Sequence, residues 1–279
     1  MSGAGEAAEA APRHSRPRRL FDVAAFVAVW IAIGEATGAG VNAYLLIGIP
    51  LTLAFQLGLR RRRIPELWVR RAPPIERRRL FAGLAIAFAV YPVYALVVTL
   101  ADPPAGEAGL LVYLAAAAIG AGAAAYAFSR FDRTRWRWLG FTLATAGVIG
   151  ALPVIVGIDI ETINLAVIDR PRSELGLGML ALLLYAPAMY VIEEVSFRAA
   201  LGSHACLPQE EHVVPTAIYL AFLWGVWQAP IVGWDQLPLL IAYHSLIGTF
   251  LSIGWHNSGN LAVSATAHAA YSSVRAALL

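Results

Sequence analysis

Long apolar segments recur along the whole chain, and short polar stretches separate them. A helix that crosses a lipid bilayer needs about 20 predominantly apolar residues, and about nine segments approach that length. These segments are 20–37, 40–58, 80–101, 109–129, 139–157, 176–198, 213–233, 237–255 and 260–279. The pattern therefore predicts an all-α, polytopic transmembrane helix bundle with about eight or nine spans.

The polar stretches divide the chain into four parts. Residues 1–19 are rich in small and polar residues, which predicts a disordered cytoplasmic tail. A first group of helices is expected over 20–157, a polar loop over 158–175 and a second group of helices over 176–279. The first group holds few ionisable side chains inside its apolar segments, Glu35 being the main exception. We therefore expect the chemistry of the protein to lie in the second group.

Charged residues are scarce and clustered. Of the 279 residues 14% are charged and 59% hydrophobic, whereas about 25% of the residues in a soluble domain are charged. The arginines gather beside apolar segments, at 13–19, 60–63, 70–79 and 130–137. By the positive-inside rule these clusters predict a cytoplasmic N-terminus. We expect an integral membrane protein of a prokaryotic cell membrane. It is expected to contact the lipid bilayer and to bind no nucleic acid.

Two features of the composition narrow the chemistry. All 21 basic residues are arginines, and the lack of lysine excludes mechanisms that need a Schiff base or a lysine base. The single cysteine, Cys206, excludes an internal disulfide and a cysteine-based zinc site.

The stretch "YVIEEVSFRAAL" places two glutamates and an arginine, Glu193, Glu194 and Arg198, at the end of an apolar segment. A lone ionisable side chain at the bilayer centre costs about 2.5–3.5 kcal/mol on insertion scales, so three close together indicate function. Glu194 and Arg198 are four residues apart and share a helix face, whereas Glu193 points about 100° away. One carboxylate is expected to pair with Arg198 while the other faces a cavity. The alternative is that both glutamates simply end the span at the membrane surface.

Polar residues also line one face of the last apolar segment. Ser264, His268, Ser272 and Arg275 recur there at a spacing of three to four residues. His268 lies near the middle of the segment. It is either part of a site shared with the glutamates or a hydrogen-bonding contact between helices.

Two further segments offer polar side chains. In "FLWGVWQAP", Trp224 and Gln228 share a face, and Gln228 comes shortly before Pro230, where a kink is expected. In the next segment His244 is the most informative polar residue. Helix packing alone would also account for the tryptophan and the glutamine.

Three short motifs in 176–279 have a recognisable order and spacing. "EEVSFR" at 193–198 matches an E-E-x-x-x-R motif, "WGVWQ" stands at 224–228 and "HAAYS" at 268–272. Together they resemble the CPBP intramembrane proteases, which include the type II CAAX prenyl endopeptidases and the Abi proteins. In that family the second motif is F-x-x-x-H and the third is H-x-x-x-N or H-x-x-x-D. This chain therefore departs from the family at Trp224, Gln228 and Ser272.

The resemblance implies hydrolysis of a peptide bond of a membrane-embedded or lipidated protein inside a membrane cavity. It makes Glu193 the base that activates water, and Glu194 and Arg198 the residues that orient it. It makes His268 the group that binds the oxyanion or the water, with Ser272 as a weaker donor. No cofactor follows with certainty; a divalent metal such as zinc would find ligands in Glu193, Glu194 and His268, although the missing histidine of the second motif weakens such a set.

Gln228 separates two functional hypotheses. An amide can hold a water molecule but cannot take its proton, and loss of an acid–base partner typically costs about 10²–10⁴-fold in rate. Either His244 substitutes and the protein is an active intramembrane endopeptidase, or the protein is a catalytically inactive relative that acts as a membrane binding, immunity or assembly factor. A transporter-like use of the same polar residues is disfavoured, because the sequence shows no internal repeat.

Overall fold

Helices make up nearly all of the part of the chain that the structure describes. This computed structural model describes residues 14–38, 40–72, 76–78, 81–82, 85, 107–155, 189–234 and 237–278. Within these ranges the only extended pairing is an isolated bridge between Val69 and Asn260. The predicted all-α class is confirmed for this part of the protein.

The helices follow one another in the order expected from the apolar segments. The N-terminal group comprises α1 (Arg16–Thr37), α2 (Val41–Ala54), the π-helix η1 (Phe55–Leu59), the 3-10 helix η2 (Ile64–Leu67), α4 (Glu107–Phe128) and α5 (Arg133–Ile155). The C-terminal group comprises the π-helix η4 (Val195–Gly202), α7 (Ser203–Ala205), α8 (Val213–Trp227), α9 (Ala229–Val232), α10 (Leu237–Ser258) and α11 (Leu261–Leu278). Helix α1 begins within the first arginine cluster, with a proline in its first turn, and ends at Gly38 in a left-handed conformation (φ 58°).

Three of the described helices are long and apolar enough to cross a membrane. They are Arg16–Thr37, Val213–Ile231 and Leu237–Ser258, and they coincide with three of the predicted spans. Two shorter apolar helices cover Ala43–Leu59 and Ala118–Phe128. Most of the expected spans over 80–101 and 176–198, and the whole polar loop over 158–175, lie outside the described residues. The total of eight or nine spans therefore stays a prediction.

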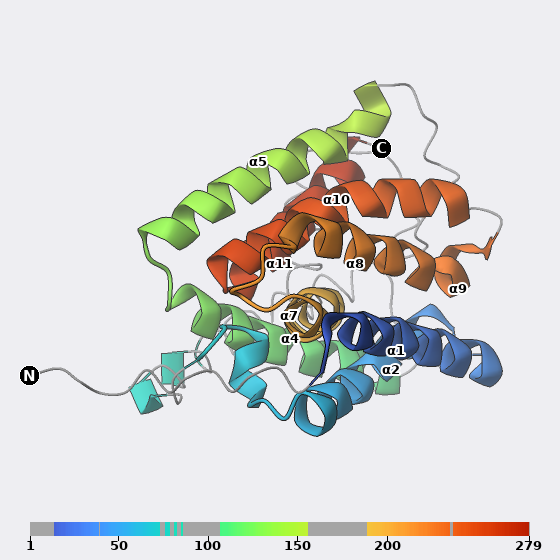
Figure 1. Cartoon of the computed structure of the whole chain (residues 1–279), viewed down its shortest axis with the longest axis horizontal. Coiled ribbons are helices and arrows are strands. Elements are labelled where there is room, and N and C mark those ends of the chain that lie inside the picture. The colour runs from blue at the N-terminus through green and yellow to red at the C-terminus, as the bar shows by residue number, and fades with distance from the viewer. Residues whose placement is uncertain are drawn as a thin grey trace, which may run out of the picture.

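One helix runs through the interior of the C-terminal group. We call residues 193–205 the central helix; it consists of Glu193 and Glu194, then η4, then α7. It is seen nearly end-on at the middle of Figure 1, with α8, α10 and α11 on one side and α1 and α2 on the other. Its π-helical part contacts α2, α8, α10 and α11. Every residue of that part is buried, so the polar groups of the central helix lie inside the protein.

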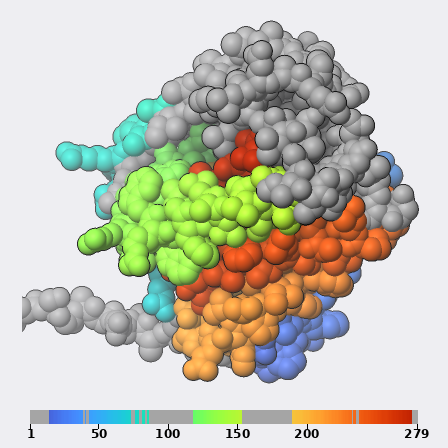
Figure 2. Space-filling model, turned by 90° about the horizontal axis from the view of Figure 1, so that it is seen from above, coloured from blue at the N-terminus to red at the C-terminus, as the bar shows by residue number. Residues whose placement is uncertain are grey.

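Helices α8 and α10 pack closely because small residues face the contact between them. A Cβ atom on Gly225 would lie 2.8 Å from Cα of Ile241, and one on Gly248 would lie 2.8 Å from Cβ of Ala221. Both positions therefore require glycine, as is common where membrane helices approach each other. Figure 2 shows α5, α10 and α8 side by side on one face of the molecule.

The arginine clusters meet the C-terminal group at one end of the molecule. Arg70 and Arg135 donate to the carbonyls of His256 (2.8 Å) and Ser258 (3.3 Å), at the C-terminal end of α10. Cations are favoured there because the carbonyls at a helix C-terminus carry partial negative charge. The arginine-rich loops and the end of α10 therefore share one side.

Charged side chains also join α1 to the segment between α7 and α8. Arg19 forms a hydrogen-bonded ion pair with Glu210, and Asp22 contacts Nε2 of His204 through Oδ2 at 3.1 Å. Burial raises the pKa of the Glu210 carboxyl, but hydrogen bonds from Arg19 and from the Leu207 amide outweigh it and hold this pKa below its usual value. These contacts fix the start of α1 against the end of the central helix.

The predicted orientation can be tested by labelling. Cys206 is buried, so an Arg62→Cys substitution in a Cys206→Ser background provides a single reporter in the arginine-rich region. Membrane-impermeant maleimide added outside intact cells is expected not to react with it, because the positive-inside rule places this loop in the cytoplasm. Gly40→Cys, in the turn between α1 and α2, is the matched position expected to react from outside. Rapid external labelling at position 62 would overturn the orientation.

Candidate active site

The central helix starts at the first glutamate of the E-E-x-x-x-R motif. Residues 190–192 form a turn, the helix begins at Glu193, and it continues past Arg198 to Ala205. Most of this length is π-helical, a conformation with i→i+5 hydrogen bonds that is frequent at functional sites. The turn places Glu193 and Glu194 at the entry of this helix.

Glu194 and Arg198 form an ion pair in the interior. Both side chains have 0% exposure, and Nη2 of Arg198 lies 3.4 Å from Oε1 of Glu194. The guanidinium also lies over the indole ring of Trp224, 4.6 Å from the ring centroid. The opposite charge and the π-face both offset the cost of burying the cation.

His268 brings α11 to the same carboxylate. Its Nδ1 lies 3.0 Å from Oε1 of Glu194, and its side chain is buried. An ionised carboxylate only accepts hydrogen bonds, so Nδ1 carries the hydrogen and Nε2 is the basic nitrogen of the neutral ring. Helix α11 is held in place at its start by Asn260, whose amide donates to the carbonyl of Ala127 (2.7 Å) and whose Oδ1 accepts from the amide of Ala262 (3.0 Å).

Trp224 lies at the centre of the polar group. Its Nε1–H donates to Oε2 of Glu193 at 2.9 Å. Its ring makes edge contacts with the rings of His244 and His268, with centroids 4.5 Å and 5.0 Å away. This tryptophan therefore connects the central helix, α10 and α11, and its N–H is a donor that a phenylalanine side chain would lack.

His244 enters the site from α10. Its side chain is buried, and Nδ1 lies 2.9 Å from the carbonyl oxygen of Leu240. A carbonyl accepts and never donates, so Nδ1 carries the hydrogen in this ring as well, and Nε2 is its basic nitrogen. Two imidazoles therefore approach the same indole ring, one from α10 and one from α11.

Gln228 and Ser272, the last residues of the second and third motifs, are buried but are not hydrogen-bonded to the glutamates. Gln228 ends α8 one turn beyond Trp224, and no described residue hydrogen-bonds to its Oε1. Ser272 lies one turn beyond His268 on α11, with 8% exposure. Neither residue makes a hydrogen bond or ion pair with Glu193 or Glu194 in the described part of the chain. The side chain of Arg275 lies outside the described residues.

The two glutamates have different environments. Glu194 is fully buried between Arg198 and His268, whereas Glu193 is only half-buried and is bonded to Trp224. In the parts of the chain that the structure describes, no three His, Cys, Asp or Glu side chains cluster closely enough to hold a metal ion. Glu193 is thus the more accessible carboxylate of the two.

Comparison with known proteins agrees with the motifs. Residues 175–274 match the family model described as type II CAAX prenyl endopeptidase Rce1-like. This range includes the central helix, α8, α10 and the site-forming part of α11. No curated protein and no solved structure matches the chain. The predicted resemblance is confirmed: residues 175–274 match the model of the Rce1-like CAAX-protease family, in agreement with the three motifs.

Proposed function

We propose that the protein is an intramembrane endopeptidase that hydrolyses a peptide bond of a membrane-embedded or lipidated protein. The family match supports a membrane endopeptidase of the CAAX-protease type in general. The proposal that a glutamate activates the water rests on the different environments of the two glutamates. Glu193 is the less buried of the two and is held by an indole N–H, whereas Glu194 is fully buried and paired with Arg198.

Glu193 is the general base in this proposal. Trp224 donates to Oε2, so Oε1 takes the proton of a water molecule. The water oxygen forms a bond to the carbonyl carbon of the substrate, and the carbonyl oxygen becomes an oxyanion. The protonated Glu193 then gives its proton to the amide nitrogen as the carbon–nitrogen bond breaks. The proton taken from the water thus ends on the leaving nitrogen, and Glu193 returns to its ionised form.

His268 stabilises the reacting oxygen. Glu194 accepts from Nδ1 and so fixes the ring, with Nε2 on the opposite side of the imidazole. Nε2 accepts a hydrogen bond from the water, and then from the hydroxyl group that this water contributes to the tetrahedral intermediate. The ring so orients the water oxygen toward the carbonyl carbon while Glu193 removes the other proton of the water.

His244 takes the place of the histidine that the second motif lacks. It approaches Trp224 more closely than His268 does, with ring centroids 4.5 Å and 5.0 Å from the indole. Gln228, which stands where the family has histidine, has no bond to this group within the described residues. The imidazole that relays a proton is therefore supplied by α10 and not by α8.

The role of His244 can be tested with purified protein in lipid vesicles that carry a fluorogenic membrane-embedded peptide. His244→Gln is expected to lower the rate of hydrolysis by about 10²-fold or more, because an amide cannot relay a proton. Gln228→His in the same background is expected to restore part of the rate. If His244→Gln is neutral and Gln228→His alone raises the rate, α10 does not supply the relay.

Trp224→Phe tests how Glu193 is held. The ring is retained and only the N–H donor is lost, and a hydrogen bond to a charged group contributes about 1.5–3 kcal/mol. We expect the rate to fall by about 10–100-fold in the vesicle assay. Trp227→Phe is the matched control, because among the described residues no group accepts from Nε1 of Trp227. Equal losses in the two variants would contradict the proposed role.

A second candidate function is that of an inactive relative which binds a membrane partner at the same residues. The observation in its favour is the amide of Gln228 at the position of a catalytic histidine. This function is supported if neither the wild type nor Gln228→His cleaves any peptide while Glu193→Ala still removes a cellular phenotype. Measurable hydrolysis that Glu193→Ala abolishes supports the endopeptidase instead.

A further inference from the structure

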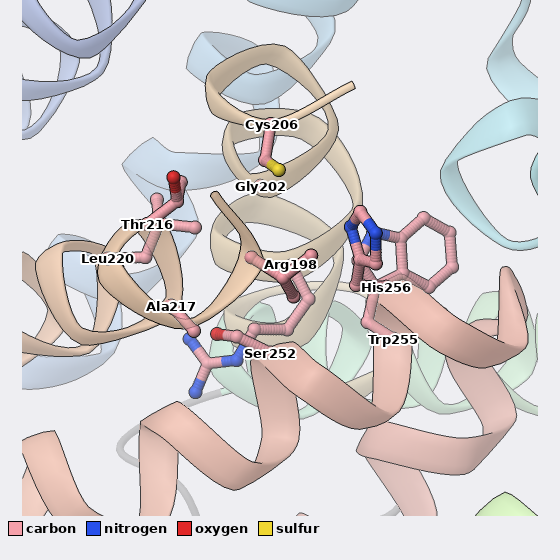
Figure 3. A pocket seen from close by; sticks show the side chains of 10 residues that line it. Arg198, Gly202, Cys206, Thr216, Ala217, Leu220, Ser252, Trp255 and His256 are labelled. Atoms are coloured by element: carbon pink, nitrogen blue, oxygen red, sulfur yellow. The ribbon is translucent and has the colours of Figure 1, made fainter. Parts of the chain in front are cut away.

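A small pocket lies between the central helix, α8 and α10. It has a volume of about 10 Å³, and Figure 3 shows its lining side chains. Val213 at the start of α8 and His256 near the end of α10 line it, so it opens toward the arginine-rich side of the molecule. Arg198 and Ser252 line it deeper in the protein.

Arg198 presents buried donors to this pocket. A guanidinium has five N–H donors, and this one is completely buried. Its nearest anion, Oε1 of Glu194, is 3.4 Å from Nη2, and none of Nε, Nη1 and Nη2 has a hydrogen-bond partner among the residues that the structure describes. Buried polar groups are nearly always hydrogen-bonded, because a donor removed from water without an acceptor is costly.

Ser252 presents a second polar group from the opposite wall. It has 5% exposure, and its Oγ also has no hydrogen-bond partner within the described part of the chain. Figure 3 shows its hydroxyl and the guanidinium of Arg198 at the same end of the pocket. The hydroxyl is not bonded directly to the guanidinium, although both line the same small space.

We propose that this pocket holds one ordered water molecule that accepts a hydrogen bond from Arg198 and donates one to Oγ of Ser252. A volume of about 10 Å³ is close to the minimum that admits one water, and a buried water needs two to four polar partners. A neutral ligand suits the site better than an anion, because Glu194 already balances the charge of Arg198. The water satisfies the buried donor and the hydroxyl at once.

The water makes Ser252 a positioning residue for the candidate active site. It anchors the side of Arg198 that faces the pocket, Arg198 pairs with Glu194, and Glu194 orients His268. The chain of contacts thus extends from α10 to the imidazole on α11. The water site does not depend on hydrolysis, since the same buried charges would require it in an inactive relative.

The test compares Ser252→Thr with Ser252→Val in detergent-solubilised protein. The two side chains have the same shape, so any crowding by the added methyl group cancels, and they differ in the hydroxyl alone. With a bridging water, the valine variant is expected to melt about 2–4 °C below the threonine variant. A valine variant that melts at the same temperature or higher would overturn the proposal, because a dry pocket favours the apolar side chain.

Ser252→Ala provides a second measurement, in which a wet and a dry pocket predict different changes of the melting temperature. Removing a hydroxyl that has no partner from a dry pocket leaves the melting temperature unchanged or raises it, whereas removing a partner of the water lowers it. Ser245→Ala, on the same helix but outside the pocket, controls for the change in helix propensity. A drop at position 252 that exceeds the drop at 245 supports the water site, and the absence of such a difference overturns it.

The rate of peptide hydrolysis tests whether Ser252 helps to position the residues of the active site. In the vesicle assay Ser252→Thr is expected to keep a rate near that of the wild type, whereas Ser252→Val loses about 10-fold through the loosened Arg198 and Glu194. Equal rates in the two variants would show that Ser252 does not act on the site. If the wild type cleaves nothing, the endopeptidase proposal fails, and the order of melting temperatures still decides the water site.

Discussion

Glu193→Gln is expected to reduce peptide hydrolysis by at least about 10²–10⁴-fold, to the background of empty vesicles. Glutamine has nearly the same size, and its amide oxygen can still accept the hydrogen bond from Nε1 of Trp224. It cannot take a proton from water, so the loss isolates the general-base step from binding and folding. Initial rates in lipid vesicles, together with the melting temperature of the variant, measure both quantities.

Glu35→Gln is a closely matched control. Glu35 also accepts a hydrogen bond from a tryptophan, Nε1 of Trp234 at 3.2 Å, but this contact is exposed and Glu35 belongs to none of the three motifs. The control is expected to leave the rate unchanged. If Glu193→Gln and Glu35→Gln have the same rate as the wild type, Glu193 is not the base, and Glu194 is the carboxylate to replace next.

Arg198→Met is expected to destabilise the protein by about 3–5 kcal/mol, the typical cost of removing one partner of a buried ion pair. The remaining carboxylate of Glu194 would have 0% exposure and no cation beside it. Thermal or denaturant unfolding in detergent measures the loss. Arg18→Met removes an exposed partner from another i,i+4 pair, with Asp22 at 2.9 Å, and is expected to cost at most about 1 kcal/mol.

The double variant Glu194→Gln, Arg198→Met separates the charge effect from packing. When both charges are removed, no unpaired ion remains in the interior. The double variant is therefore expected to be more stable than Arg198→Met alone. Additive losses would show that the two side chains contribute independently through packing. In either case hydrolysis is expected to be lost, because His268 no longer has an ionised partner at Nδ1.

The apolar segments predicted α1, α8 and α10 because bilayer-length runs of apolar residues allow few structures other than helices. The i,i+4 spacing of Glu194 and Arg198 likewise predicted a pair on one face, and the structure places their charged atoms 3.4 Å apart. Such features depend on local periodicity alone, and local periodicity is what a single sequence shows directly.

Other features depend on how helices cross, and the sequence carries no local signal for them. The turn at 190–192 and the π-helix up to Leu201 occur in "YVIEEVSFRAAL", which contains no glycine or proline. The hydrogen bond from Trp224 to Glu193 requires the indole edge to point across to another helix. The approach of His244 to Trp224 follows from the close contact of α8 and α10, which Gly225 and Gly248 permit.

The π-helix Val195–Gly202 makes the length of this segment as important as its composition. Successive residues are turned by about 100° on an α-helix and by somewhat less on a π-helix with its i→i+5 hydrogen bonds, so deleting one residue after Arg198 would rotate everything beyond it by nearly that angle. His204 would then turn away from Asp22, its partner on α1 at 3.1 Å, although the helix itself would remain intact. We therefore expect single-residue insertions and deletions at 199–202 to separate the motif-bearing helices from α1, even where substitutions in the same stretch are tolerated.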